Sequence, residues 1–278
     1  MLGELLDNVR RRRPLIHSIT NYVTANDCAN ILLACGGSPI MADDIGEVEE
    51  ITALCGGLNI NIGTLNARTV PAMLAAGKKA NELGRPVVLD PVGAGASALR
   101  TDTALRLLEQ IRFSVIRGNI SEIKALALGR GSAPRASTQG VDADVGDAVT
   151  AGTLNEAVRF VKGFAQKTGA VAAVTGAIDI VADADRAYCV FNGHPMMSAV
   201  TGTGCQLSAM TAAFAAANPD RVLEAAAAAV CAMGVCGELA HKRLGELDGN
   251  SSYRNYIIDA AYRLDGGTLD RMANYKTI

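Results

Sequence analysis

LNINIGTLNARTVPAMLAAGKKANELGRPVVLDPVGAG, residues 58–95, is the stretch that decides the fold class. It opens on an apolar run of strand length at 58–62 and continues with a helical pattern at 67–83, which Gly84 closes. A second buried-strand pattern follows at 87–90. A strand, a helix and another strand in this order are typical of a parallel sheet covered by helices.

The same alternation continues on both sides of this stretch. We expect further strands at 14–19, 38–42, 113–116, 170–174, 178–182 and 186–191. We expect further helices at 23–34, 47–54, 101–110, 121–128, 153–167, 204–217, 221–243 and 251–264. The pattern predicts one α/β domain over residues 1–278, with a mostly parallel central sheet and helices on both faces.

Two segments do not follow this pattern. Residues 129–150 are rich in Gly, Ser, Ala and Asp, and we expect an exposed loop there because the alternation resumes directly afterwards. Residues 10–13 are four arginines, which we interpret as the solvated end of a helix, where cations complement the helix dipole.

Composition excludes several classes of protein. A hydrophobic share of 49% excludes a disordered chain. A net charge of −2 with 4% aromatic residues argues against a nucleic-acid partner. The apolar run 225–237 is too short to span a membrane and predicts a buried helix, and we expect no signal peptide and no membrane partner. Seven cysteines without a CxxC pair favour free thiols and a cytoplasmic location.

The strongest local motif is Thr201-Gly-Thr-Gly-Cys205, which runs directly into a helical pattern. Small residues before a helix leave its first N–H groups available to a phosphate or a developing oxyanion, and Gly202 and Gly204 permit close approach. An ordinary glycine-rich turn explains the same residues. Cys205 lies at the helix start, where a thiol pKa is lowered, and is a candidate base or nucleophile, with a packed thiol as the alternative.

Carboxylates and an arginine follow other predicted strands. Asp90 ends a buried strand, where it suits Mg²⁺ and substrate phosphates, although turn and capping roles are common for Asp. Arg117 adds a bidentate phosphate donor beside Asn119 and Glu122, whose spacing also fits a capping box. Thr175 ends another short strand, where its hydroxyl can reach a phosphate or a sugar.

These strand ends and the glycine-rich helix start together indicate an ATP-dependent phosphotransferase. No lysine follows the glycines, so the helix start is not a P-loop. A dinucleotide fingerprint starting at Gly93 would need glycine at position 98, which is alanine, and a NAD-dependent dehydrogenase is therefore disfavoured. Phosphoryl transfer depends mostly on positioning and charge stabilisation, which such a site supplies.

The chain resembles the hydroxyethylthiazole kinases, a family of the ribokinase-like superfamily. Its motifs occur in the family's order and cover nearly the whole chain: HSITNYVT at 17–24, NDCAN at 26–30, SPIMA at 38–42, NINIGTL at 59–65, LDPVGAG at 89–95, RGNISE at 117–122 and TGTGC at 201–205.

The resemblance implies a ribokinase-like three-layer fold and a homotrimer with active sites between subunits. It implies phosphorylation of the hydroxyl of 4-methyl-5-(2-hydroxyethyl)thiazole by ATP with Mg²⁺, in thiamine salvage. Cys205 stands where ribokinase relatives usually have an Asp base. Carried over by motif, the thiazole contacts are Asn21, Met41, Gly63 and Gly202, the ATP contacts are Arg117 and Thr175, and the groups that organise Mg²⁺ are Asp90 and Glu122. From the residue patterns we add Asn119 and Gly204 on the ATP side.

Two alternatives stay open. One is a related kinase that acts on hydroxymethylpyrimidine or pyridoxal, against which the segments around Asn21 and Met41 argue. The other is a nucleotide-binding sensor without catalysis, which the presence of Asp90, Glu122 and Cys205 disfavours.

Overall fold

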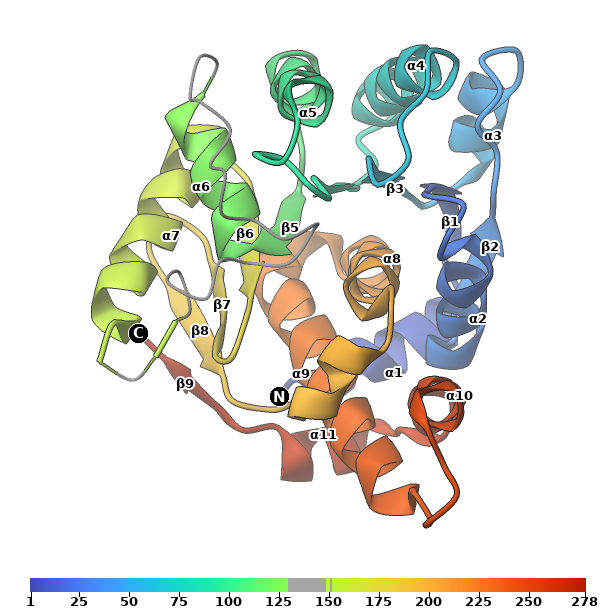
Figure 1. Ribbon diagram of the computed structural model, residues 1–278. Helices are drawn as coiled ribbons and strands as arrows, with labels where there is room; N and C mark the ends of the chain where they lie inside the picture. Colours follow the sequence, from blue (N-terminus) through green and yellow to red (C-terminus); the bar gives the residue numbers. More distant parts are fainter. Residues whose placement is uncertain (130–148, 151) are drawn as a thin grey trace.

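The protein is described by a computed structural model that covers residues 1–129, 149–150 and 152–278. Within these residues one sheet of nine strands runs through the molecule in the order β2-β1-β3-β4-β5-β6-β7-β8-β9 (Figure 1). Strands β1 to β6 pair in parallel, and β7, β8 and β9 each pair antiparallel to the preceding neighbour in the sheet. The strands are β1 (Leu15–Ile19), β2 (Ser38–Ile40), β3 (Gly57–Asn61), β4 (Val87–Asp90), β5 (Val115–Asn119), β6 (Val171–Thr175), β7 (Asp179–Ala182), β8 (Ala187–Val190) and β9 (Tyr275–Thr277).

Helices cover both faces of this sheet (Figure 1). One apolar cluster joins a sheet face to α3, α4, α5, α6 and α7, and the other joins the opposite face to α1, α2, α8, α9, α10 and α11. The helices are α1 (Gly3–Arg12), α2 (Ala25–Cys35), α3 (Val48–Leu54), α4 (Thr69–Glu82), α5 (Ala98–Gln110), α6 (Ile120–Leu128), α7 (Leu154–Thr168), α8 (Thr203–Ala217), α9 (Val222–Arg243), α10 (Asn250–Arg263) and α11 (Gly266–Met272). The mostly parallel α/β sheet with helices on both faces is therefore confirmed.

Alternation along the strands explains both clusters. In β4, Val88 packs towards α8 and α9, whereas Val87 and Leu89 pack towards α4 and α5. Successive strand side chains point to opposite faces, so a strand covered on both faces shows a continuous apolar run. This is why the short runs in the sequence predict buried strands.

Helix α9 forms the centre of the larger cluster. Among the helices that the structure describes, only the segment Pro219–Arg243 is long and apolar enough to cross a membrane by length and composition. However, 78% of its apolar window is buried inside the protein. The prediction of a buried helix for 225–237 is confirmed.

Some elements differ from the sequence predictions. The strand predicted at 113–116 extends to Asn119, because Arg117 and Asn119 pair with Ala173 and Thr175 of β6. Helix α11 and strand β9 were not predicted. All three residues of β9 are exposed, so it has no apolar run to reveal it. The predicted loop at 129–150 lies outside the described residues except at 129, 149 and 150.

The predicted helix end at the arginine run is confirmed, but one of its cations is not simply solvated. Helix α1 carries Arg10, Arg11 and Arg12 in its last turn. The guanidinium of Arg10 donates hydrogen bonds to the carbonyl oxygens of Ala261 and Tyr262, at 3.0 and 2.9 Å. It thereby holds the end of α10 against α1.

Candidate active site

The polar side chains of the candidate site share one face of the sheet at the carboxyl ends of β3 to β6. Asn61 is the register partner of Asp90, and Asn119 is the register partner of Thr175. Arg117 lies two residues before Asn119 on the same strand, so its side chain points to the same face. This is the face that α8 covers, and ligands of parallel α/β sheets bind at this edge.

Asp90 is completely buried, and its two oxygens have different surroundings. Oδ2 accepts hydrogen bonds from Asn61 Nδ2 and Ser208 Oγ, both at 2.8 Å. Within the described residues Oδ1 accepts no hydrogen bond and lies 3.7 Å from Arg117 Nη1. Burial raises the pKa of this carboxyl, and the nearby Arg117 opposes that shift without cancelling it. One buried oxygen is therefore left for a ligand.

Arg117 joins the strand ends to the start of α8. Its Nη2 donates a hydrogen bond to Thr175 Oγ1 at 2.6 Å. A Cβ added at Gly204 would lie 2.8 Å from the Arg117 Cζ and closer still to both Nη atoms. The guanidinium thus packs directly on Gly204, at which the motif predicts the close approach of a phosphate. Arg117, Thr175 and Gly204 are brought together as one cluster.

The start of α8 has the features of an anion-binding site. Gly202 occupies the N-cap position with a φ of +85° and provides no capping side chain. A Cβ at this position would also collide with the Thr24 side chain. Because an α-helix does not use its first N–H groups internally, those of residues 203–205 are available to a ligand beside Arg117. The helix start that the motif at 201–205 predicts, with its first N–H groups not capped by a side chain, is therefore present.

Cys205 lies in the first turn of α8, in contact with Asn21. Asn21 Nδ2 donates a hydrogen bond to the sulfur at 3.3 Å, and Asn21 Oδ1 accepts from the backbone and hydroxyl of Thr24. Burial raises the pKa of the Cys205 thiol, and the charge of Asp90 raises it further. The expectation of a lowered thiol pKa is therefore wrong. Burial and the Asp90 carboxylate both disfavour the thiolate, and they outweigh the opposing effect of Arg117.

Glu122 and Asn119 form the capping box that the sequence allowed. Asn119 Oδ1 accepts from the Glu122 backbone N–H, and Glu122 Oε2 accepts from the Asn119 backbone N–H. Glu122 Oε1 also accepts from the Gly93 backbone N–H at 2.8 Å. This carboxyl therefore holds the loop after β4 against the start of α6. Burial, and next the charge of Asp90, raise the pKa of Glu122 to about 7.

The activity is expected to fall as the pH decreases through about 7, because Glu122 then loses the charge with which it accepts hydrogen bonds from the Gly93 loop and the start of α6. The contribution of Glu122 to folding stability changes with pH in the opposite direction, since it decreases as the pH rises. Since its pKa in the fold lies above the ordinary 4.5, this carboxyl stabilises the fold below pH 4.5 and loses that contribution as the pH rises through about 7. The predicted fall in activity is tested by profiles of kcat/KM against pH for the wild type and Glu122→Gln across the neutral range. An acidic limb that is identical in both would contradict it.

The remaining predicted contacts lie nearer the first strands. Gly63 donates its backbone N–H to Asn61 Oδ1 at 2.9 Å, and its carbonyl accepts from the Arg100 guanidinium at 2.8 Å. Gly63 therefore joins the cluster through its backbone. Met41 follows β2 and is partly exposed, with 38% of its surface accessible. Its neighbour Ala42 accepts a hydrogen bond at its carbonyl from the buried His17 ring at 2.8 Å, which ties this segment to β1.

The donor set fits magnesium bound together with a nucleotide. Among the described residues no group of three or more His, Cys, Asp or Glu side chains can hold a metal ion. Mg²⁺ does not need such a group, because one or two carboxylates with substrate phosphates and waters complete its six ligands. Asp90 Oδ1 offers one buried acceptor for this purpose, whereas both oxygens of Glu122 already accept from the backbone.

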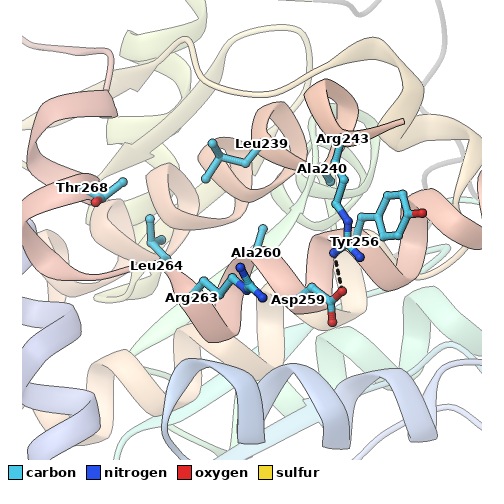
Figure 2. A pocket seen from close by; sticks show the side chains of 9 residues that line it. All are labelled: Leu239, Ala240, Arg243, Tyr256, Asp259, Ala260, Arg263, Leu264 and Thr268. Carbon is cyan, nitrogen blue, oxygen red and sulfur yellow. Dashed lines mark hydrogen bonds and ion pairs between the residues drawn. The ribbon is translucent and has the colours of Figure 1, made fainter. Parts of the chain in front are cut away.

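A separate hollow of about 430 Å³ lies between α9, α10 and α11, away from these residues. Figure 2 shows its lining, in which Arg243 pairs with Asp259 at 2.5 Å and lies over the Tyr256 ring. None of the site residues that the sequence predicts lines it.

The architecture defines the class of protein. Pyridoxal kinase from Staphylococcus aureus, solved in complex with AMP-PCP and pyridoxal, superposes with a TM-score of 0.59. The match covers 95% of this chain and 98% of that one at 12% identity, so it shows the fold alone. The chain has the ribokinase-like fold, as the sequence analysis expected.

Sequence similarity identifies the family within this class. The model of the hydroxyethylthiazole kinase family matches residues 6–266. Hydroxyethylthiazole kinase of Clostridium acetobutylicum is 66% identical over 277 residues, which cover 100% of both chains. The solved hydroxyethylthiazole kinase of Pyrococcus horikoshii OT3 is 37% identical with a TM-score of 0.86, over 100% of this chain and 98% of that one. The chain belongs to the hydroxyethylthiazole kinase family.

Proposed function

We propose that this chain transfers the γ-phosphoryl group of ATP to the hydroxyl of 4-methyl-5-(2-hydroxyethyl)thiazole, in thiamine salvage. Membership of the hydroxyethylthiazole kinase family supports this substrate. The observation that carries the mechanism is the meeting of Arg117, the buried Asp90 Oδ1 and the uncapped start of α8. Arg117 and the first N–H groups of α8 neutralise charge on a phosphoryl group, whereas the Asp90 carboxylate, which is itself negative, would contribute through the Mg²⁺ that it holds.

The nucleotide binds on the side of β5 and β6 in this proposal. Arg117 and Thr175 contact its phosphates, supported by their mutual hydrogen bond, and Gly204 lets the phosphates approach the α8 backbone. Asn119 orders the same edge through its capping box. Asp90 would hold Mg²⁺, since its Oδ1 accepts no hydrogen bond within the described residues, while Glu122 holds the loop at Gly93 beside it. When bound, the cation supplies charge neutralisation for the phosphates.

The thiazole binds on the side of β1 and β2. Asn21, Met41 and Gly63 follow the carboxyl ends of β1, β2 and β3, and Gly202 lies against Thr24 close to Asn21. The substrate hydroxyl then points towards Cys205 and the helix start. The attack is in line, and the α8 amides stabilise the transferred group.

Cys205 accepts or shares the proton of the attacking hydroxyl. The raised pKa keeps the thiol mostly protonated, so Cys205 is a weak proton acceptor. Because the transition state is loose, little base assistance is needed early in the reaction. Cys205→Ala is therefore expected to lower kcat by about 10²-fold, the lower end of general base catalysis, without abolishing turnover. Steady-state kinetics measure this. Complete loss of turnover in a folded variant that still binds both substrates would contradict the limited role of the thiol.

We further propose a homotrimer with active sites between subunits. The support is a set of exposed apolar side chains that includes the predicted thiazole contact Met41 and residues near it or Asn21 in the sequence: Tyr22, Val23 and Ile45. Large exposed apolar patches mark interaction sites. Sedimentation equilibrium tests the trimer, and a monomer at assay concentrations would contradict it.

We also propose a cytoplasmic location, which the seven free cysteines support. We propose a single domain, because the two apolar clusters lie on the two faces of one sheet.

The choice of acceptor alcohol tests the proposed function against its alternatives. We expect kcat/KM for hydroxyethylthiazole to exceed that for hydroxymethylpyrimidine and pyridoxal by at least about 10²-fold, because misplaced acceptors lose the in-line geometry. A preference for either competitor would assign the chain to a related kinase. ATP binding without turnover of any alcohol would indicate the sensor.

A further inference from the structure

Asn61 lies between Asp90 on one side of the candidate site and Asn21 on the other. It is the last residue of β3, is 1% exposed and is the register partner of Asp90. Its Nδ2 donates to Asp90 Oδ2 at 2.8 Å. Its Oδ1 accepts from Asn21 Nδ2 at 3.0 Å and from the Gly63 backbone at 2.9 Å.

Each amide in this chain of hydrogen bonds has a defined orientation. Asn21 Oδ1 accepts two hydrogen bonds from Thr24, so its Nδ2 must face Asn61 and Cys205. The Nδ2 group has two hydrogens, one for Asn61 Oδ1 and one for the Cys205 sulfur. Asn61 must then turn its own Nδ2 towards the carboxylate. The result is one continuous path from Asp90 through Asn61 and Asn21 to Cys205.

The chemistry of this position requires a side chain that donates on one side and accepts on the other. A carboxylate at position 61 has no donor for Asp90, and an apolar residue has neither function. Ser208 provides a comparison, because it donates to the same Asp90 oxygen, and within the described residues its other hydrogen bond goes to the Gly204 carbonyl and not to Asn21. Together Asn61 and Ser208 occupy Oδ2, which leaves Oδ1 facing Arg117.

We propose that Asn61 is a positioning residue that fixes the Asp90 carboxylate on the nucleotide side relative to the Asn21–Cys205 pair on the acceptor side. It touches neither substrate and acts through these neighbours. The inference rests on the proposed function, since it assigns the two sides to Mg²⁺–ATP and the thiazole. It predicts that loss of Asn61 weakens the binding of both Mg²⁺–ATP and the thiazole, whereas loss of Ser208 weakens the binding of Mg²⁺–ATP alone.

The chain offers a matched control at Asn59. It lies two residues earlier on the same strand and face, is fully buried, and donates its amide to Ser18 Oγ at 3.0 Å instead of to a site residue. Asn59→Ala and Asn61→Ala therefore remove the same buried amide from the same strand. Only the second breaks the path to Asp90 and Asn21. Asn61→Ala also removes more hydrogen bonds, three against one, because Asn59 Oδ1 accepts none within the described residues.

The experiment measures the melting temperature, the separate affinities for Mg²⁺–ATP and for hydroxyethylthiazole by calorimetry, and kcat. Asn61→Ala is expected to weaken both affinities several-fold and to lower kcat by about 10–100-fold, the usual cost of losing a residue that orients a ligand-binding group. Ser208→Ala is expected to weaken Mg²⁺–ATP alone. Asn59→Ala is expected to keep both affinities within about twofold while its melting temperature falls.

Three results would overturn the inference. The first is kinetics of Asn61→Ala that match those of Asn59→Ala, and the second is a Ser208→Ala variant that also loses thiazole affinity. The third is an unchanged Mg²⁺–ATP affinity in Asn61→Ala, which decides the matter even if the wild type phosphorylates no thiazole and the proposed function fails. If Asn61→Ala does not fold, Asn61→Ser, which is too short to span both partners, takes its place in the same comparison.

Discussion

Asp90→Asn is expected to lower kcat/KM for Mg²⁺–ATP by about 10²–10³-fold, the range seen when one preorganised electrostatic group is removed from a reacting site. The substitution keeps the shape of the side chain and an oxygen that can accept from Asn61 and Ser208. It removes the negative charge from the buried atom that faces Arg117. The half-saturating Mg²⁺ concentration is expected to rise in parallel.

The same substitution is expected not to lower the melting temperature. Burial raises the pKa of Asp90 despite Arg117, which means that the charged form costs the fold free energy. Functional sites often carry such a cost, so neutralising the group trades activity for stability. Kinetics with varied Mg²⁺ and a thermal melt measure the two effects. An unchanged Mg²⁺ dependence would contradict the assignment of Asp90.

Gly204→Ala is expected to lower kcat/KM for ATP by about 10²-fold, because a displacement of about 1 Å in a positioning group has an effect of this size. The new Cβ would meet the guanidinium of Arg117. That group ends a flexible side chain and can move aside, so the helix itself tolerates alanine. In moving, the guanidinium loses its 2.6 Å hydrogen bond to Thr175 and its place at the phosphates.

Gly163→Ala is the matched control for this prediction. Gly163 lies within α7, and a Cβ there meets nothing within 4 Å. It is expected to stabilise the protein by about 0.5–1 kcal/mol, the usual gain from alanine over glycine in a helix, with unchanged kinetics. If Gly204→Ala retained wild-type kcat/KM for ATP, the phosphate contact assigned to Arg117 and the α8 start would be wrong.

The sequence predicted the polar strand ends because buried strands have a clear signature and their carboxyl ends meet at one edge. Asp90 and Thr175 end β4 and β6, as expected. Arg117 was expected after its strand and lies within it, since pairing with β6 continues beyond the apolar run. The motif at 201–205 likewise starts a helix without a side-chain cap.

The properties that the sequence did not predict depend on contacts between distant segments. The role of Asn61 follows only from the register of β3 with β4, which places it beside Asp90. The sequence does contain one indication of it, since Asn59 and Asn61 are two polar residues on the same face of a buried strand. The raised pKa of Cys205 depends on burial and on Asp90, which lies 115 residues earlier in the chain. Helix position alone predicted the opposite direction.

The central claim is thiazole-dependent phosphoryl transfer, and the most direct test is ADP release from Mg²⁺–ATP with and without hydroxyethylthiazole, with the product identified by mass. We predict ADP formation that depends on the thiazole, together with a thiazole that carries one phosphoryl group on its hydroxyl. Folded protein that binds ATP but forms neither product would contradict the claim.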